Sequence, residues 1–342
     1  MRKPGPLIVI LLLLTLLMVT GCSKTEPTNS VAANKATTSS FDTAPITTTL
    51  IQATPSGVLF MLSNGIAESL NKTYPGSVLH ITPGNPTSNV DRLVRGEAEF
   101  ALTYNTSTMS AVEGKEREPH PELKAIAALK TSPMQFVLKE DIGALTLDDI
   151  INKQIKLKLC IGLPDSVTEQ TFIQVLQQYK LTKADMQGWG CAFVNKGPEE
   201  TAQMFSDGAI DGYFYGLSAP HPSIMKNALD KKISMITINP DVIDAVCQTY
   251  GYEKITIPAG SYTFLTEDYH TFTDYIILST TDKVSNETAY KIARSLHQNI
   301  EYITLIHSAL RDLSEEKMVN KLKVPIHPGA LIYYKEAGLV QE

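Results

Sequence analysis

The sequence has no cluster of basic residues. Its 30 Lys and Arg are outnumbered by 36 Asp and Glu, and the formal net charge is −6. A chain with this charge repels phosphate backbones, which argues against a nucleic-acid partner. Hydrophobic residues make up 43% and charged residues 19%. These are ordinary values for a globular protein, and they fit neither a disordered chain nor a polytopic membrane protein.

Signals for metal binding and for nucleophilic catalysis are also missing. The seven histidines show no metal-ligand spacing, and His327 before Pro328-Gly329 is interpreted as a turn or helix-cap residue. Neither Ser56 nor Ser166 lies in a Gly-x-Ser-x-Gly elbow, and no base can be assigned to either serine. We therefore expect no metal, no cofactor and no catalytic residues, so that the protein is not an enzyme.

Cysteine is scarce, with four residues in the chain. If Cys22 carries a lipid, the three that remain cannot all pair with one another. Cys160 and Cys191 lie in two strand-like segments, 156–161 and 189–194, that are separated by one helix. Neighbouring parallel strands would allow a disulfide between them, whereas the alternative is buried thiols that act as small apolar residues.

The N-terminus has the layout of a secretion signal, with a basic start, an apolar run over 7–18 and the pair Gly21-Cys22. The run is shorter than the ~20 residues that span a bilayer. We expect 1–22 to be a lipoprotein signal peptide, with a lipid such as palmitate on Cys22. The protein would then be exported and lipid-anchored to the cell membrane, facing the periplasm or the cell exterior. An uncleaved anchor, or a signal peptide with an incidental cysteine, is the alternative.

The segment after the cysteine is rich in Ser, Thr, Asn and Ala and has no hydrophobic period. We interpret 23–44 as a flexible tether. The rest of the chain is long enough for two domains.

Strand and helix patterns alternate in this main part. Strands are predicted at 78–82 and 100–104, and a helix begins at Ser88, with Asp91 completing a capping box and Gly96 ending it. Repeated βαβ units predict a largely parallel sheet.

A second run of the same alternation begins near residue 138, with strands at 156–161 and 211–215 and a helix from Ser166. A strand at 271–280 and a single amphipathic helix over 286–306 follow. The predicted fold class is α/β with two lobes and a ligand cleft between them. Lobe I takes 45–137 and 263–342, and lobe II takes 138–262.

Ligands bind outside the carboxyl ends of parallel strands, so the loops there are the candidate site. Two of them end in a hydroxyl residue at a helix start, in 54–57 and 165–168. Unpaired N–H groups at helix starts bind carboxylates or phosphates, although plain N-capping is the alternative. The predicted ligand-binding residues are Thr54, Ser56, Gly57, Asn85, Ser88, Asn89, Tyr104, Asn105, Asp165, Ser166, Thr168, Tyr215 and Tyr262.

Two long segments resemble the TAXI family of TRAP transporter solute receptors. They are Thr256-Ile257-Pro258-Ala259-Gly260-Ser261-Tyr262 and Val324-Pro325-Ile326-His327-Pro328-Gly329-Ala330. The resemblance implies a type II periplasmic-binding-protein fold and a monomer that captures a small organic anion or amino acid, glutamate-like, for a TRAP-type membrane permease. A receptor that feeds a sensor kinase and, less favoured, a secreted hydrolase remain as alternatives.

The sequence departs from this family in both predicted binding loops. Pro55 removes a backbone donor from the first loop, and Asp165 places a carboxylate in the second. A carboxylate beside the site disfavours a second negative charge. We therefore also consider a ligand that is more cationic or neutral than is usual for the family.

Overall fold

The computed structural model describes residues 41, 43–53, 57–115 and 118–341, all within the compact unit Thr38–Glu342. The predicted signal peptide, Cys22, Thr54 and Ser56 lie outside the described residues, as does almost all of the predicted tether. Within the described part of the chain, no helix is both long and apolar enough to cross a membrane.

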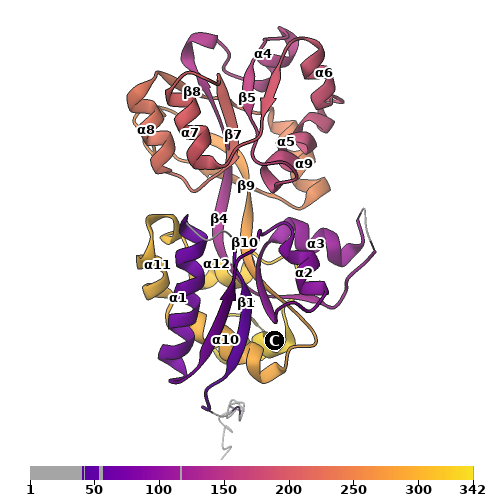
Figure 1. Cartoon of the computed structure of the whole chain (residues 1–342), viewed down its shortest axis with the longest axis vertical. Coiled ribbons are helices and arrows are strands. Elements are labelled where there is room, and N and C mark those ends of the chain that lie inside the picture. The colour runs from indigo at the N-terminus through magenta and orange to yellow at the C-terminus, as the bar shows by residue number, and fades with distance from the viewer. Residues whose placement is uncertain (1–40, 42, 54–56, 116–117, 342) are drawn as a thin grey trace, which may run out of the picture. The chain divides into compact units, whose positions relative to one another are not determined.

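Ten strands form one sheet in the order β2-β1-β3-β10-β4-β7-β5-β6, with β8 on β4 and β9 on β10. The strands are β1 Thr47–Ile51, β2 Val78–Thr82, β3 Phe100–Tyr104, β4 Leu123–Lys139, β5 Lys158–Cys160, β6 Ala192–Val194, β7 Gly212–Gly216, β8 Ile233–Met235, β9 Glu253–Ile257 and β10 Tyr269–Thr281. The other elements form two groups, one around β1, β2 and β3 and one around β5, β6 and β7. Figure 1 shows β4 and β10 running through both groups.

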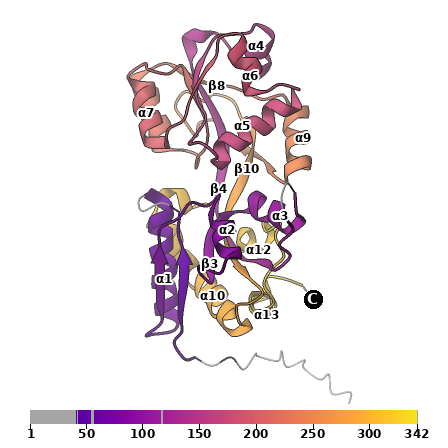
Figure 2. The same cartoon turned by 45° about the vertical axis from the view of Figure 1, so that its right-hand side comes forward.

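The helices cover the sheet in two sets, which Figure 2 shows from the side. The first set is α1 Gly57–Thr73, α2 Asn89–Val94, α3 Asn105–Glu113, α10 Asn286–Gln298, α11 Ile300–Ile306, α12 Glu315–Asn320 and α13 Pro328–Glu336. The second set is α4 Leu147–Asn152, α5 Val167–Gln178, α6 Lys183–Gly188, α7 Pro198–Ser206, α8 Pro222–Asp230 and α9 Pro240–Tyr250.

Each set encloses its own large hydrophobic core. Leu62, Ile66 and Leu70 of α1 recur at helical spacing and pack against Ile276 of β10 in the first core. Phe136, Phe172 and Phe214 contact one another edge-on or tilted in the second. The strands β4 and β10 contribute to both cores, which explains why nearly every residue of β4 is buried.

The prediction of a largely parallel sheet is wrong at its centre. β1 pairs in parallel with β2 and β3, and β5 with β6 and β7, as the βαβ pattern predicts. However, β10 is antiparallel to β3, β4 and β9, and β4 is antiparallel to β7 and β8. β10 enters long after the βαβ units are complete, so local pattern does not determine its direction.

Two helix predictions are corrected. Ser88 has φ −77° and ψ −15°, which is already helical, so its hydroxyl donates to Asn85 O (3.3 Å) instead of capping α2. The predicted helix over 286–306 is interrupted at Asn299, whose φ is −115°. The Asn299 side chain donates to Thr73 Oγ1 (2.9 Å) of α1, a contact that the local sequence cannot reveal.

The three cysteines of the described chain are free. β5 and β6 are parallel neighbours as expected, but Cys160 is opposite Val194, and Cys191 precedes the strand. The two thiols are therefore out of register. Cys160 Sγ lies 3.0 Å from Thr201 Oγ1, and Trp189 Nε1 donates to Cys191 Sγ (3.2 Å). The buried-thiol interpretation is confirmed over the disulfide for Cys160 and Cys191, whereas Cys247 is half-buried.

Candidate functional site

The start of α5 is built by a tight loop that folds back over the first turn. Gly162 has φ +87°, and a Cβ there would lie 2.7 Å from Ser166 Oγ and 2.8 Å from Thr168 Cβ, so glycine is required. Ser166 caps the helix by accepting from Glu169 N (3.3 Å). The loop thus presents Ser166, half-buried, and Thr168, 8% exposed, at the helix start.

Glu169 holds this loop in place. Its carboxylate accepts from Lys183 Nζ (2.5 Å), from Asp165 N (2.8 Å) and from Asn195 Nδ2 (3.3 Å). Burial alone would raise the pKa of Glu169, but these donors outweigh burial and lower the pKa below its ordinary value. Asp165 itself is exposed, with φ +58°, and its backbone N–H is engaged by Glu169.

Two of the predicted tyrosines lie on strands of different groups of elements. Tyr104 ends β3, and Tyr215 lies in β7, where its hydroxyl donates to Lys196 O. Burial raises the pKa of both phenols, and Tyr104 is near enough to add to the rise in the pKa of Tyr215. Both hydroxyls are therefore neutral at physiological pH. The Tyr104 O–H can donate to a ligand, whereas the Tyr215 O–H is donated to Lys196 O and leaves only its oxygen as an acceptor.

The turn from β3 into α3 is joined to β10 by a buried carboxylate. Thr106 Oγ1 donates to Asp274 Oδ2 (2.5 Å), and Tyr275 N donates to Asp274 Oδ1 (2.7 Å). Burial raises the pKa of Asp274 to about 6 despite these donors. Asn105, 1% exposed, donates to Lys321 O (3.0 Å) and accepts from Lys323 N (3.1 Å), so its amide links α3 to the C-terminal segment.

The loop before α2 contains three of the predicted site residues. Asn89 is fully buried, and its Nδ2 donates to Gln52 O and to Leu102 O, both at 2.9 Å. Its Oδ1 accepts from Asn85 N (3.0 Å). Asn85 and Ser88 are exposed. The Asn89 amide therefore joins three backbone segments, whereas the two exposed side chains are available to other partners.

Two predicted site residues remain, Gly57 and Tyr262, which are the first and the last of the described ones in sequence order. Gly57 is exposed at the first residue of α1, with φ +77°. Tyr262 is 2% exposed, donates to Gln135 Oε1 (2.5 Å) and accepts from His221 N (2.9 Å). Tyr262 thus connects β4 to the start of α8.

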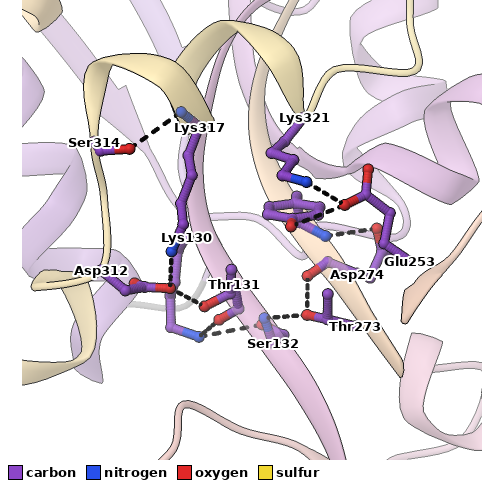
Figure 3. A network of polar contacts seen from close by, with 11 residues as sticks. Lys130, Thr131, Ser132, Glu253, Thr273, Asp274, Asp312, Ser314, Lys317 and Lys321 are labelled. Carbon is purple, nitrogen blue, oxygen red and sulfur yellow. Dashed lines mark hydrogen bonds and ion pairs between the residues drawn. The ribbon is translucent and has the colours of Figure 1, made fainter. Parts of the chain in front are cut away.

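Sequence reasoning missed Lys130 in the middle of β4. Its side chain is buried, with 9% exposed, and Nζ donates to Thr131 O (2.8 Å) and Ser132 Oγ (3.1 Å), as Figure 3 shows. Burial lowers the pKa of Lys130 to about 8, and the nearby Asp312 carboxylate opposes the shift. The signal that could have found it is a lysine inside an apolar run, in the stretch 125–138.

Among the described residues, no group of three or more His, Cys, Asp or Glu could hold a metal ion. His327 serves as the N-cap of α13 and accepts from Gly329 N (3.1 Å), which confirms its interpretation as a cap residue.

Comparison with solved structures identifies the fold. MatC from Rhodopseudomonas palustris with bound malate superposes with a TM-score of 0.52 at 11% identity, covering 86% of this chain and 97% of that one. PhnD1 from Prochlorococcus marinus in complex with methylphosphonate gives 0.51 at 13% identity, covering 86% and 99%. The chain has the α/β periplasmic-binding-protein fold that the sequence predicted.

The sequence also matches the model of a protein family, described as the NMT1-like family, over residues 50–338. This match extends from β1 to the residues just after α13, so it includes every element that contributes to the candidate site. The chain belongs to the NMT1-like family.

Proposed function

We propose that this protein is an extracytoplasmic receptor that captures a small organic anion or amino acid, glutamate-like, and delivers it to a TRAP-type membrane permease. The observation that carries the proposal is the placement of Tyr104 and Tyr215 on the strands that flank β4 and β10, because β3 pairs with β10 in one group of elements and β7 pairs with β4 in the other. A ligand held there would contact both groups at once.

In this proposal the groups act as the two lobes, with 45–137 and 263–342 as lobe I and 138–262 as lobe II. The strands β4 and β10 connect the lobes and serve as the hinge. Closure around the ligand would exclude water and strengthen each polar contact, and the closed form would be the one that the permease recognises. The receptor acts as a monomer and carries no cofactor.

The ligand contacts in lobe II are assigned to Ser166 and Thr168 at the start of α5, together with Tyr215. Those in lobe I are assigned to Tyr104, to the loop that contains Asn85 and Ser88, and to the start of α1 at Gly57. The Asn89, Asn105 and Tyr262 side chains are assigned to positioning, since their polar atoms are occupied by protein partners.

Two solved structures of the same fold support an anionic ligand. MatC holds malate and PhnD1 holds methylphosphonate. We propose that this chain likewise binds a small anion, and that it hands the anion to a permease without converting it chemically. Export and attachment through a lipid on Cys22 complete the proposal, because a tethered receptor would remain close to its permease.

Differential scanning fluorimetry of the mature protein tests the proposal with L-glutamate, malate, methylphosphonate and a cationic control, L-arginine. A ligand at 100 times its Kd stabilises the folded state by about 2.7 kcal/mol, which raises the Tm visibly. We expect a shift with at least one anion and an unchanged ligand after incubation. No shift with any anion, or chemical conversion of the ligand, would overturn the proposal.

A further inference from the structure

Lys130 lies in the middle of β4, which pairs with β10 at the centre of the sheet. It is directly opposite Ile276 on β10, and Ile276 is opposite Tyr104 on β3. Directly opposed residues of antiparallel strands share a face, so Tyr104, Ile276 and Lys130 form one row. Ile276 packs in the core that contains Leu62 and Ile66 of α1. The row therefore lies on the face of the sheet that is covered by this core.

Ser132 extends this row along β4. It is two residues from Lys130 and therefore on the same face, and it lies opposite Asp274. Its hydroxyl accepts from Lys130 Nζ (3.1 Å). Across the row, the Tyr104 hydroxyl has no hydrogen-bond partner in the described part of the chain, although the ring is half-buried. An ammonium, a hydroxyl and a phenol thus share one surface.

The charge on Lys130 is buried without a carboxylate partner. Its ammonium has three N–H groups, and the two bonds shown in Figure 3 go to neutral oxygens. No carboxylate of the residues that the structure describes forms an ion pair with it within 4.0 Å. Asp312 is occupied elsewhere, since it accepts from Thr131 Oγ1 (2.5 Å) and pairs with Lys317 Nζ (3.5 Å).

The second group of elements also reaches this charge. His221, at the start of α8, is half-buried. Burial, with smaller contributions from the nearby Lys130 and His307, lowers the pKa of His221 to about 4. His221 is therefore neutral at pH 7 and adds no second cation from that side.

We propose that Lys130 is the residue that neutralises the carboxylate of the bound ligand, with Ser132 and Tyr104 as neighbouring polar contacts. The inference rests on the proposed receptor function and narrows its ligand to a small carboxylate. Burial of an ammonium removes its hydration, which costs free energy. A bound anion compensates for this cost, most of all where the protein supplies no counterion. Asp165, which suggested a cationic or neutral ligand, is exposed, so solvent screens its charge.

Isothermal titration calorimetry with L-glutamate and malate tests this assignment. We expect Lys130→Met to weaken binding of whichever carboxylate the wild type binds by at least about tenfold, and Lys130→Arg to retain most of the affinity. Lys124→Met is the matched control, because Lys124 lies on the same strand and its ammonium donates to the backbone oxygens of Pro121 and Leu123, with no carboxylate paired to it among the described residues. The control should bind as the wild type does.

A second measurement does not depend on the folding of the Met variant. Titrations of the wild type at pH 8 in two buffers of different ionisation enthalpy report proton uptake. A bound carboxylate should raise the pKa of Lys130 above about 8, so binding takes up protons. Lys130→Arg should lose this uptake because arginine does not titrate there. The other titratable or charged groups around the site, unchanged in that variant, are His221, His307, Asp312, Lys317, Tyr104 and Tyr275.

The outcomes separate the two proposals. If the wild type binds a carboxylate and Lys130→Met binds it equally well, or if no proton is taken up, the role of Lys130 is overturned and the receptor function stands. If the wild type binds neither these carboxylates nor methylphosphonate, both proposals are overturned.

Discussion

Asn89 illustrates how a polar residue at a predicted binding loop can serve the fold. Its amide bonds to the backbone at Gln52, Leu102 and Asn85, and its side chain is fully buried. Asn85, four residues earlier, is exposed, and its side chain accepts from Thr87 N (2.9 Å). The sequence shows two asparagines in one loop, and only burial separates their roles.

We predict that Asn89→Ala lowers the free energy of unfolding by about 3 kcal/mol, because it leaves two backbone carbonyls and one N–H unpaired in the interior. Asn85→Ala should cost less than about 0.5 kcal/mol, since its exposed partners can bond to water. Urea unfolding without ligand measures both. Equal losses for the two variants would contradict the structural role of Asn89.

A second prediction at this scale concerns Asp274. Burial raises its pKa to about 6, from ~3.9 in an unfolded chain. The folded state then holds the proton more tightly than the unfolded state. This contribution to stability is fully present below pH ~3.9 and is lost as the pH rises through about 6. The difference of about two pKa units corresponds to about 3 kcal/mol.

Asp274→Asn should remove this pH dependence, because the amide does not ionise. The difference in unfolding free energy between the variant and the wild type should change by about 3 kcal/mol in favour of the variant from pH 4 to pH 8. Loss of the bond from Thr106 adds an offset that does not vary with pH. Parallel stability profiles would show that the Asp274 pKa is not raised.

At the scale of the element, two serines with similar sequence contexts behave differently. Ser166 has φ −73° and ψ 156°, outside the helix, and caps α5. Ser88 has helical angles and does not cap α2. Each is followed three residues later by an acidic residue, Glu169 or Asp91. The motif predicts a cap in both cases, but the backbone entering the helix decides whether one forms.

We predict that Ser166→Ala lowers the free energy of unfolding by about 1 kcal/mol, the usual effect of losing an N-cap. Ser88→Ala should change it by less than about 0.3 kcal/mol, because no capping bond is lost. Thermal unfolding of the ligand-free variants provides the comparison. The expectation is contradicted if the Ser88 variant is the less stable of the two.

At the scale of the whole molecule, ion pairs connect the segment after α12 to β9. Glu253 pairs with Lys321 (2.9 Å) and Lys323 (3.6 Å) and accepts from Tyr275 OH (3.2 Å), as Figure 3 shows in part. Glu253 belongs to β9 beside the second group of elements, whereas the two lysines follow α12 in the first. These contacts join segments nearly 70 residues apart.

Glu253→Gln should lower the free energy of unfolding by about 1 kcal/mol at low salt, and by less at 1 M salt, where the Debye length falls to ~3 Å. The matched control is Asp244→Asn. Asp244 pairs with Lys254 on the surface, where both side chains are exposed, so no measurable change is expected. Denaturant titrations at two salt concentrations check both. A loss independent of salt would exclude an electrostatic origin.

Local patterning was sufficient for much of the architecture. The strands Val78–Thr82 and Phe100–Tyr104 have the bounds that the sequence predicts. Hydrophobic period and flanking turn residues act within a few positions, so these elements need no tertiary information. The start of α5 was predictable for the same reason, because its cap and its glycine loop lie within seven residues.

Tertiary structure decided the features that depend on contacts between segments far apart in the chain. The antiparallel insertion of β10 between β3 and β4, the break in the helix at Asn299 and the row of Tyr104, Ile276 and Lys130 all depend on partners far apart in the chain. The sequence gives the ionisable group of each side chain. Its desolvation and its partners depend on neighbours that only folding brings together. That is why the sequence alone indicated the candidate loops, and only the structure revealed the buried ammonium of Lys130.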